Sequence, residues 1–133
     1  MTEVSRTKLP GRDLTKRTRD FALSIIRLYA ALPQTTVAQV IGKQLLRSGT
    51  SVGANYREAL RARSKPEYAA KMNLGLMELE ESMYWLELLE EGQVSNGKAV
   101  SVLKVENGEL LAISVTLIKK ARGVASASQS SAF

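Results

Sequence analysis

A short capping motif between two long helical patterns limits the fold of this chain more than any other feature. In the run Ser64-Lys65-Pro66-Glu67, the Ser64 hydroxyl can accept a hydrogen bond from the Glu67 amide. The Glu67 carboxylate can reach back to the Ser64 amide, and Pro66 suits the first turn of a helix. One helix therefore ends just before this motif and another begins in it. A turn this short makes the two helices antiparallel neighbours.

The helix before the motif is expected over residues 36–63, a range without proline. At about 100° per residue, its apolar positions share one face. They are Val37, Ile41, Leu45, Ser48, Val52, Tyr56 and Ala59. The middle of this helix is rich in small residues, including Gly49 and Gly53. Because glycine inside a helix is about 1 kcal/mol less favourable than alanine, we expect a neighbouring helix to approach closely here.

Three further helices complete the predicted fold. The first is capped by Asp13 or Thr15 and reaches Leu32, and Thr36 with Gln39 forms a weaker capping box for the second. The others are expected over residues 65–91 and 98–121. The last range also fits two strands, 99–105 and 109–117, joined at Asn107-Gly108. Heptad-like spacing favours a helix kinked near Gly108, and a lone hairpin would have no sheet to join.

These patterns predict an all-α protein, an antiparallel up-down four-helix bundle over residues 13–122. A flexible basic arm (residues 1–12), in which Pro10 and Gly11 break any helix, is expected before it. A low-complexity, disordered tail (residues 123–133) is expected after Gly123 ends the last helix.

Positive charge is concentrated in the first half of the chain. Residues 1–72 hold 14 Lys/Arg and 5 Asp/Glu and residues 73–133 hold 5 and 8, for a net charge of +6. The second helix carries a ridge of cations opposite its apolar face, and further cations follow at the turn. The predicted phosphate contacts are Lys43, Arg47, Arg57, Arg61, Arg63 and Lys65. A solvated outer face is the alternative explanation.

Other cations lie at the start of the expected bundle. Lys16, Arg17 and Arg19 fall in the first turns of the expected first helix, where positive charge opposes the helix dipole. A bound anion there would relieve this repulsion. Arg6, Lys8 and Arg12 of the arm could also contact a phosphate backbone, or could simply be solvated.

Two other side-chain sets are candidates for interaction sites. Ser51, Asn55 and Glu58 share one flank of the second helix, and are expected to form a hydrogen-bonded polar cluster at the core edge. The alternative is a site for an RNA group or a partner helix. The third helix has a second apolar set, interpreted as a subunit interface or as part of a wide core face. Its members are Leu74, Met77, Trp85 and Leu88.

The composition argues against catalysis. The chain has no cysteine and no histidine, so the commonest nucleophile–base pairs and metal ligands are missing. Only Ser51, Asn55, Glu58 and Lys71 could be nominated, and they contain no evident base–nucleophile pair. We expect a non-enzyme without metal or cofactor, whose helical glutamates are solubilising. No segment suggests secretion or membrane insertion, so a cytoplasmic location is expected.

Residues 47–91 resemble the family of 23S rRNA intervening-sequence proteins. The resemblance rests on Ser51-Val52, Asn55, Glu58, Arg63-Ser64-Lys65, Glu67-Tyr68 and Leu79-Glu80-Glu81. It implies an up-down bundle that assembles as a ring, often a pentamer. A related branch, the accessory proteins of diversity-generating retroelements, binds nucleic acid and a reverse transcriptase.

Together these features predict a homo-oligomeric bundle that binds nucleic acid, with structured RNA the favoured ligand. Binding by charge neutralisation would be salt-sensitive, and 5% aromatic residues argue against readout of stacked bases. The alternative is a protein-interaction scaffold, or an accessory subunit that docks a nucleoprotein partner such as a reverse transcriptase.

Overall fold

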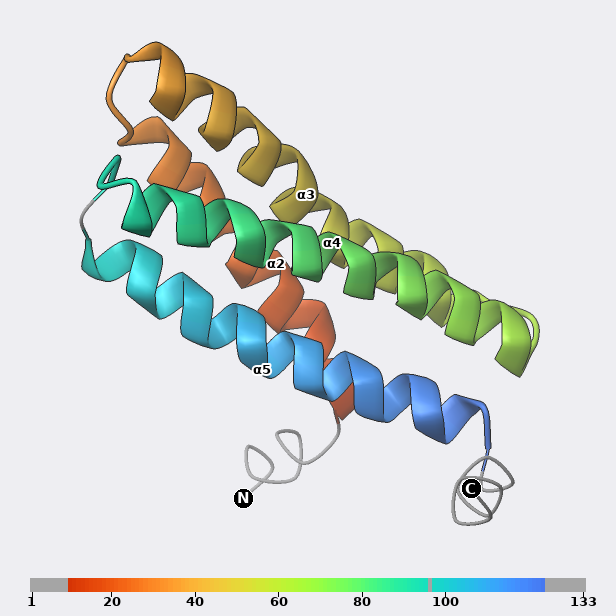
Figure 1. Cartoon of the computed structure of the whole chain (residues 1–133). Coiled ribbons are helices and arrows are strands. Elements are labelled where there is room, and N and C mark those ends of the chain that lie inside the picture. The colour runs from red at the N-terminus through yellow and green to blue at the C-terminus, as the bar shows by residue number, and fades with distance from the viewer. Residues whose placement is uncertain (1–9, 96, 124–133) are drawn as a thin grey trace.

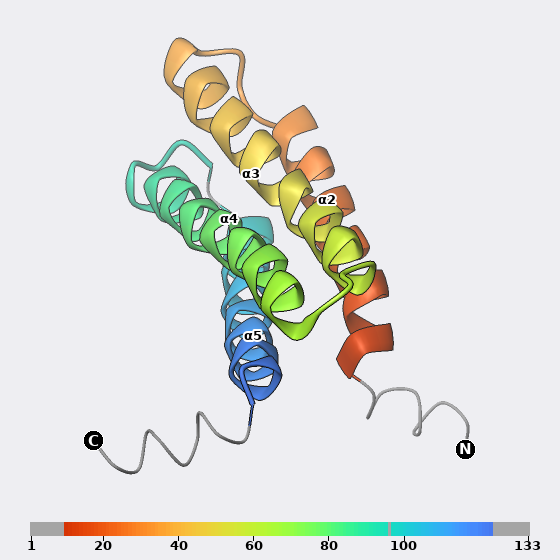
Figure 2. The same cartoon turned by 90° about the vertical axis from the view of Figure 1, so that its right-hand side faces the viewer.

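A computed structural model describes residues 10–95 and 97–123, with side chains from Leu14 onward. It contains the helices α2 (Pro10–Ala30), α3 (Thr36–Leu60), α4 (Lys65–Glu91) and α5 (Lys98–Ala121). Each helix runs antiparallel to the one before it (Figure 1) and packs against it, and α5 also contacts α2. Figure 2 shows α2 and α3 on one side of the bundle and α4 and α5 on the other. The predicted all-α, up-down four-helix bundle is confirmed.

The helix boundaries follow the predictions most closely in the second half of the chain. Both α4 and α5 have the expected bounds, and α5 continues through Asn107-Gly108, so the two-strand alternative is wrong. Gly123 follows α5 with a φ of 101° and donates to the Lys119 and Lys120 carbonyls, as expected of a helix end.

The start of the bundle differs from the prediction. The first turn of α2 begins at Pro10, so Pro10 and Gly11 do not break a helix. Proline is tolerated there because the first helical N–H groups have no partner within the helix. The same helix ends at Ala30 and α3 at Leu60, two and three residues earlier than expected. The arm prediction for residues 1–9 and the tail prediction for residues 124–133 lie outside the described residues.

Side-chain caps define the two turns of the first three helices. The Ser64 hydroxyl accepts from the Glu67 amide at 3.1 Å, as predicted, while Glu67 accepts from the Arg63 amide rather than that of Ser64. The cap of α3 is Thr35, which accepts from the Ala38 amide at 3.2 Å, so the prediction of Thr36 was one residue late. Neither turn leaves the start of its helix without a side-chain acceptor.

Gln39 ties the first turn of α3 to the end of α2. Its side-chain oxygen accepts from the Tyr29 hydroxyl at 2.8 Å, and its amide nitrogen donates to the Pro33 carbonyl at 3.0 Å. The residue predicted to complete a capping box therefore links two helices and their connection instead.

The predicted close approach at the small residues of α3 is confirmed, and α2 is the neighbour. A Cβ atom on Gly49 would lie 2.1 Å from Ile25 Cδ1, and one on Gly53 would lie 3.0 Å from Thr18 Oγ1. On Gly42, it would lie 2.6 Å from a methyl group of Leu32. These three glycines, which we call the glycine seam, allow α3 to pack this close to the α2 side of the bundle.

Apolar side chains from all four helices fill the core, but several polar groups are buried among them. The Ser48 and Ser82 hydroxyls pair across α3 and α4 at 2.7 Å. Asn107 is 0% exposed, and neither atom of its amide group has a hydrogen-bond partner among the described residues. Buried amides are usually paired, so Asn107 is an unfavourable position in this core.

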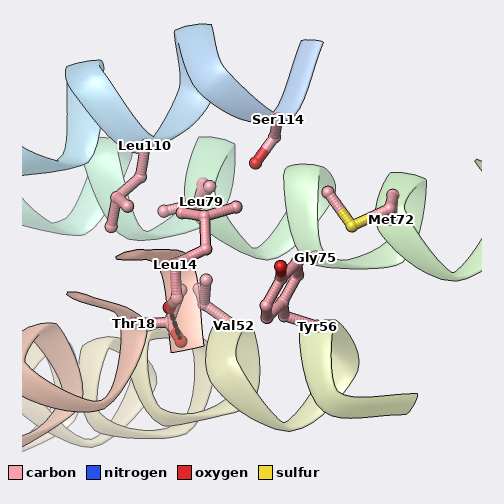
Figure 3. A pocket seen from close by; sticks show the side chains of 9 residues that line it. All are labelled: Leu14, Thr18, Val52, Tyr56, Met72, Gly75, Leu79, Leu110 and Ser114. Atoms are coloured by element: carbon pink, nitrogen blue, oxygen red, sulfur yellow. Dashed lines mark hydrogen bonds between the residues drawn. The ribbon is translucent and has the colours of Figure 1, made fainter. Parts of the chain in front are cut away.

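A small cavity of about 10 Å³ lies between the four helices, toward the end of the bundle that holds the α3–α4 turn (Figure 3). It is lined by Leu14, Thr18, Val52, Tyr56, Met72, Gly75, Leu79, Leu110 and Ser114. Burial, together with the neighbouring Tyr68, raises the pKa of Tyr56 to about 12. This tyrosine is therefore held in its neutral form at a pH where an exposed tyrosine ionises.

The raised pKa of Tyr56 predicts a loss of stability in alkali. The unfolded tyrosine ionises near pH 10 and the folded one near 12, so between these values the unfolded state binds fewer protons. Its contribution is complete below about pH 10 and falls as the pH rises toward the folded pKa. Urea unfolding should show that the free energy of unfolding falls less between about pH 9 and about pH 11 in Tyr56→Phe than in wild type. The control is Tyr84→Phe, since Tyr84 is 53% exposed; an equal loss in all three proteins would contradict the assignment.

Candidate nucleic-acid interface

All the predicted phosphate contacts lie on the surface. Lys43, Arg47 and Arg57 on α3 are exposed, and so are Arg61 and Arg63 in the α3–α4 turn and Lys65 at the start of α4. Lys43 stands apart, near the other end of α3. Arg57, Arg61, Arg63 and Lys65 are close in sequence, where α3 ends and α4 begins.

Arg47 differs from the other predicted contacts because α4 already neutralises it. Its guanidinium hydrogen-bonds the Glu81 carboxylate and lies 3.6 Å from that of Glu78. The bond to Glu81 raises the pKa of Arg47, while Glu81 has a lowered pKa through hydrogen bonds from Trp85 first and Arg47 second. Arg47 therefore joins α3 to α4, and its guanidinium is already engaged by the carboxylates of Glu81 and Glu78.

The remaining predicted cations form no ion pair within the described part of the chain. This holds for Lys43, Arg57, Arg61, Arg63 and Lys65. The acids nearest to them in sequence are engaged elsewhere. Glu58 accepts from Lys71 at 2.9 Å, and Glu67 accepts from a backbone amide at the turn. The α3–α4 turn therefore carries a surplus of positive charge.

The end of α5 adds cations to this turn. Arg122 and Ala121 line one surface groove together with Lys65 and Pro66 of α4. Lys119 and Lys120, one turn earlier on α5, are exposed as well. We call this set of cations the basic end: Arg57, Arg61, Arg63, Lys65, Lys119, Lys120 and Arg122. The sequence placed the last three at a helix C-terminus, but only the antiparallel packing of α4 and α5 brings them to this end.

The cations Lys16 and Arg17 of α2 form ion pairs. Lys16 pairs with Asp20 at 2.7 Å, and Arg17 pairs with Glu106 at 2.6 Å and Glu109 at 2.8 Å on α5. Since α2 begins at Pro10, these residues do not lie in its first turn, and the predicted repulsion with the helix dipole does not arise there. Arg6 and Lys8 lie outside the described residues.

Arg19 is the α2 cation that lies beside the predicted contacts. It lines a shallow groove between α2 and α3, of about 270 Å³, and Arg57 lines the same groove from α3. No ion pair involves Arg19 within the described ranges. Helical periodicity alone could not assign Arg19 to the basic surface, because it does not specify how α2 is rotated against α3.

The predicted polar cluster does not form as a side-chain network. Ser51 donates to the Arg47 carbonyl at 2.8 Å, and Asn55 donates to the Ser51 carbonyl at 3.0 Å, both within α3. The exposed Glu58 pairs with Lys71 of α4. Ser51 and Asn55 bond to the α3 backbone, and Glu58 pairs across the contact between α3 and α4. These bonds explain the spacing of the three residues without a ligand.

The predicted interface residues lie along the outer side of α4. Leu74 and Met77 are 45% and 54% exposed, and Leu88 is half-buried. Trp85 packs against the core edge and donates to Glu81 at 3.0 Å, so the alternative of a wide core face describes it in part. Tyr84, 53% exposed, contacts the Trp85 ring with centroids 5.0 Å apart and extends this apolar surface.

The described residues lack the features of two other classes of site. They contain no group of three or more acidic side chains placed to hold a metal ion. None of the helices in this part of the chain combines the length and apolar character needed to span a bilayer.

Comparison with known proteins agrees with this architecture. A model of the 23S rRNA-intervening sequence protein family matches residues 12–115. A crystal structure of a protein of unknown function from the S23 ribosomal protein family of Bacteroides thetaiotaomicron is 33% identical, with a TM-score of 0.78. The match covers 84% of this chain and 100% of that one. Among proteins with curated functions, none matches at a significant level. The extent of the family match and this structural likeness show that the chain belongs to the 23S rRNA-intervening sequence protein family.

Proposed function

We propose that this protein is a non-enzymatic, homo-oligomeric bundle that binds structured RNA through its basic end. The observation that carries the proposal is the surplus of cations where α3, α4 and α5 meet, with the neighbouring acids Glu58 and Glu67 already engaged. Phosphate groups would neutralise these cations and release condensed counterions. The family's name supports RNA as the first nucleic acid to test.

Binding without base readout is part of the proposal. Phe21 and Tyr56 are buried, so they offer no stacking surface to a base. The exposed Tyr84 lies toward the end of α4 opposite to the basic end. Recognition would therefore depend on phosphate positions rather than on base edges, which is how structured RNA helices are usually bound.

Self-association is proposed from the outer side of α4. Leu74 and Met77 are exposed there beside Tyr84 and the half-buried Leu88, and such apolar surface is typical of a protein interface. A ring, with a pentamer as the expected size from the family resemblance, would repeat the basic end around its axis. Several copies of a weak phosphate-binding surface on one particle would raise the overall affinity for an extended RNA.

The test is binding of a fluorescein-labelled RNA hairpin, measured by anisotropy over a range of salt concentrations with a matched DNA duplex in parallel. Arg61→Glu/Arg63→Glu should weaken binding about tenfold or more and reduce the dependence of log K on log salt by about two. The control is Arg27→Glu/Lys98→Glu, an equal change of charge at the other end of the bundle. Native mass spectrometry should show the same oligomer for all three proteins.

Two results would contradict the proposal. One is no binding of RNA or DNA by wild type at low salt, which would favour the protein-interaction scaffold, with the basic end docking an acidic or nucleoprotein partner such as a reverse transcriptase. The other is an equal loss of RNA affinity in both charge-reversed variants, which would indicate that binding depends on the net charge of the protein rather than on the basic end.

A further inference from the structure

The groove between α2 and α3 carries two arginines and no acidic side chain. Its lining consists of small side chains and two arginines, one from each helix. The members are Thr18, Arg19 and Ala22 on α2 and Thr50, Gly53, Ala54 and Arg57 on α3. No carboxylate contributes to the lining, so the two guanidinium groups share a groove without a counter-charge on its walls.

The acids beside the two arginines in the chain are already paired. Asp20 follows Arg19, and its carboxylate accepts a hydrogen bond from the Lys16 ammonium at 2.7 Å. This hydrogen bond is the largest cause of the lowered pKa of Asp20. Glu58 follows Arg57 and turns to Lys71 on α4. Neither Arg19 nor Arg57 forms an ion pair within the described ranges. Arginine suits a phosphate ligand because its planar guanidinium can donate two parallel hydrogen bonds to phosphate oxygens.

The lining residues other than the two arginines are neutral, and their hydroxyl groups already have hydrogen-bond partners. Gly53 allows α2 to approach so closely that a Cβ there would lie 3.0 Å from Thr18 Oγ1. The Thr18 hydroxyl donates to the Leu14 carbonyl at 2.7 Å, and the Thr50 hydroxyl donates to the Leu46 carbonyl at 2.7 Å. Both hydroxyl protons are thus committed to the helices, and the arginines are the long side chains that remain to contact a ligand.

We propose that this groove seats one phosphate of a nucleic-acid backbone, held between Arg19 and Arg57. The inference rests on the proposed function and adds a located contact on the α2–α3 flank. Arg57 belongs to both the basic end and the groove, so a strand bound at the basic end would continue along this flank. Arg19 thereby becomes a binding residue, although it lies outside the ridge on α3.

The test adds a carboxylate to the groove without changing the core. Ala54 is exposed on α3 and lines the groove, so Ala54→Glu adds an acid to the groove that the two arginines share, at a position where a helix tolerates glutamate. We expect binding of the labelled RNA hairpin to weaken about fivefold or more, with the salt dependence reduced by about one or two. The matched control is Ala112→Glu, an exposed position within α5 that should change binding far less.

A second pair of variants tests the arginine on α2 directly. Arg19→Gln should weaken binding more than Arg27→Gln, which removes the same charge from an exposed position on the same helix. Arg19→Lys should restore only part of the affinity, because an ammonium cannot bind a phosphate through two parallel hydrogen bonds.

The outcomes separate this inference from the proposed function. If wild type binds RNA and Arg61→Glu/Arg63→Glu weakens it, while each groove variant matches its control, the basic end stands and the groove is excluded as a phosphate seat. If wild type binds no RNA at low salt, both ideas fail together. If Ala54→Glu does not fold, the two glutamine variants still decide the question.

Discussion

Replacing Gly49 by leucine is expected to lower the free energy of unfolding by about 3 kcal/mol, since overfilling a packed core has a cost of this order. Gly49 is buried in the glycine seam, and even a Cβ atom there would lie 2.1 Å from Ile25 Cδ1. Ile25 is itself 0% exposed, so it has no solvent-filled space into which to move. The rest of the leucine side chain could fit only if α2 moved away from α3.

The measurement is urea unfolding followed by circular dichroism, with Gly108→Leu as the control. Gly108 is also inside a helix, but a Cβ there would meet nothing within 4 Å. The control should gain up to about 1 kcal/mol from better helix propensity. Equal stability of the two variants would mean that α2 does not approach α3 as closely as the structure shows.

Replacing Asn107 by leucine is expected to have the opposite effect, raising the free energy of unfolding by about 2 kcal/mol. Asn107 is 0% exposed, and both its amide atoms lack partners among the described residues. Unfolding returns this amide to water, so its burial favours the unfolded state. Leucine branches at the same carbon as asparagine, and it replaces the unpaired polar atoms with methyl groups.

The contrast with Ser48 makes the Asn107 experiment decisive. Ser48 is equally buried but shares a 2.7 Å hydrogen bond with Ser82, so Ser48→Ala should lower stability by about 1 kcal/mol. Thermal and urea unfolding of both variants would test the pair. A loss of stability in Asn107→Leu would show that the amide has a partner in solution. If Asn107→Leu is stable but its oligomer differs in mass from that of wild type, Asn107 would instead select one helix arrangement over others. Buried asparagines have this role in coiled coils.

The fold could be predicted from the sequence because its signals are local. The Ser64 cap depends on residues within one turn, and the apolar periodicity of α3 and α4 is carried by each helix alone. The start of α2 was missed because Pro10 was interpreted as a helix breaker, although proline is compatible with a first helical turn. The α3 cap was displaced by one residue because Thr35 and Thr36 carry the same hydroxyl.

The candidate site was less predictable because it depends on how the helices face each other. Arg47 lies on the outer face of α3, but only the rotation of α4 reveals that Glu81 and Glu78 meet it. Arg19 and Arg122 join the basic surface through packing between helices that a wheel for one helix does not contain. Periodicity predicted that the cations are exposed, although Val37, from the expected apolar face of α3, is 57% exposed as well. The ion pairs and neighbours of the cations required the tertiary structure.

The order of packing around the bundle also has a consequence for how the chain reaches this state. Among the described helices, each lies against the one that precedes it in sequence, and only the contact between α2 and α5 joins helices that are not consecutive. Helical proteins with such local contacts have low contact order and fold within microseconds to milliseconds. We expect the α3–α4 hairpin, capped at Ser64, to form early, and the contact between α2 and α5, with the ion pairs of Arg17 to Glu106 and Glu109, to form last.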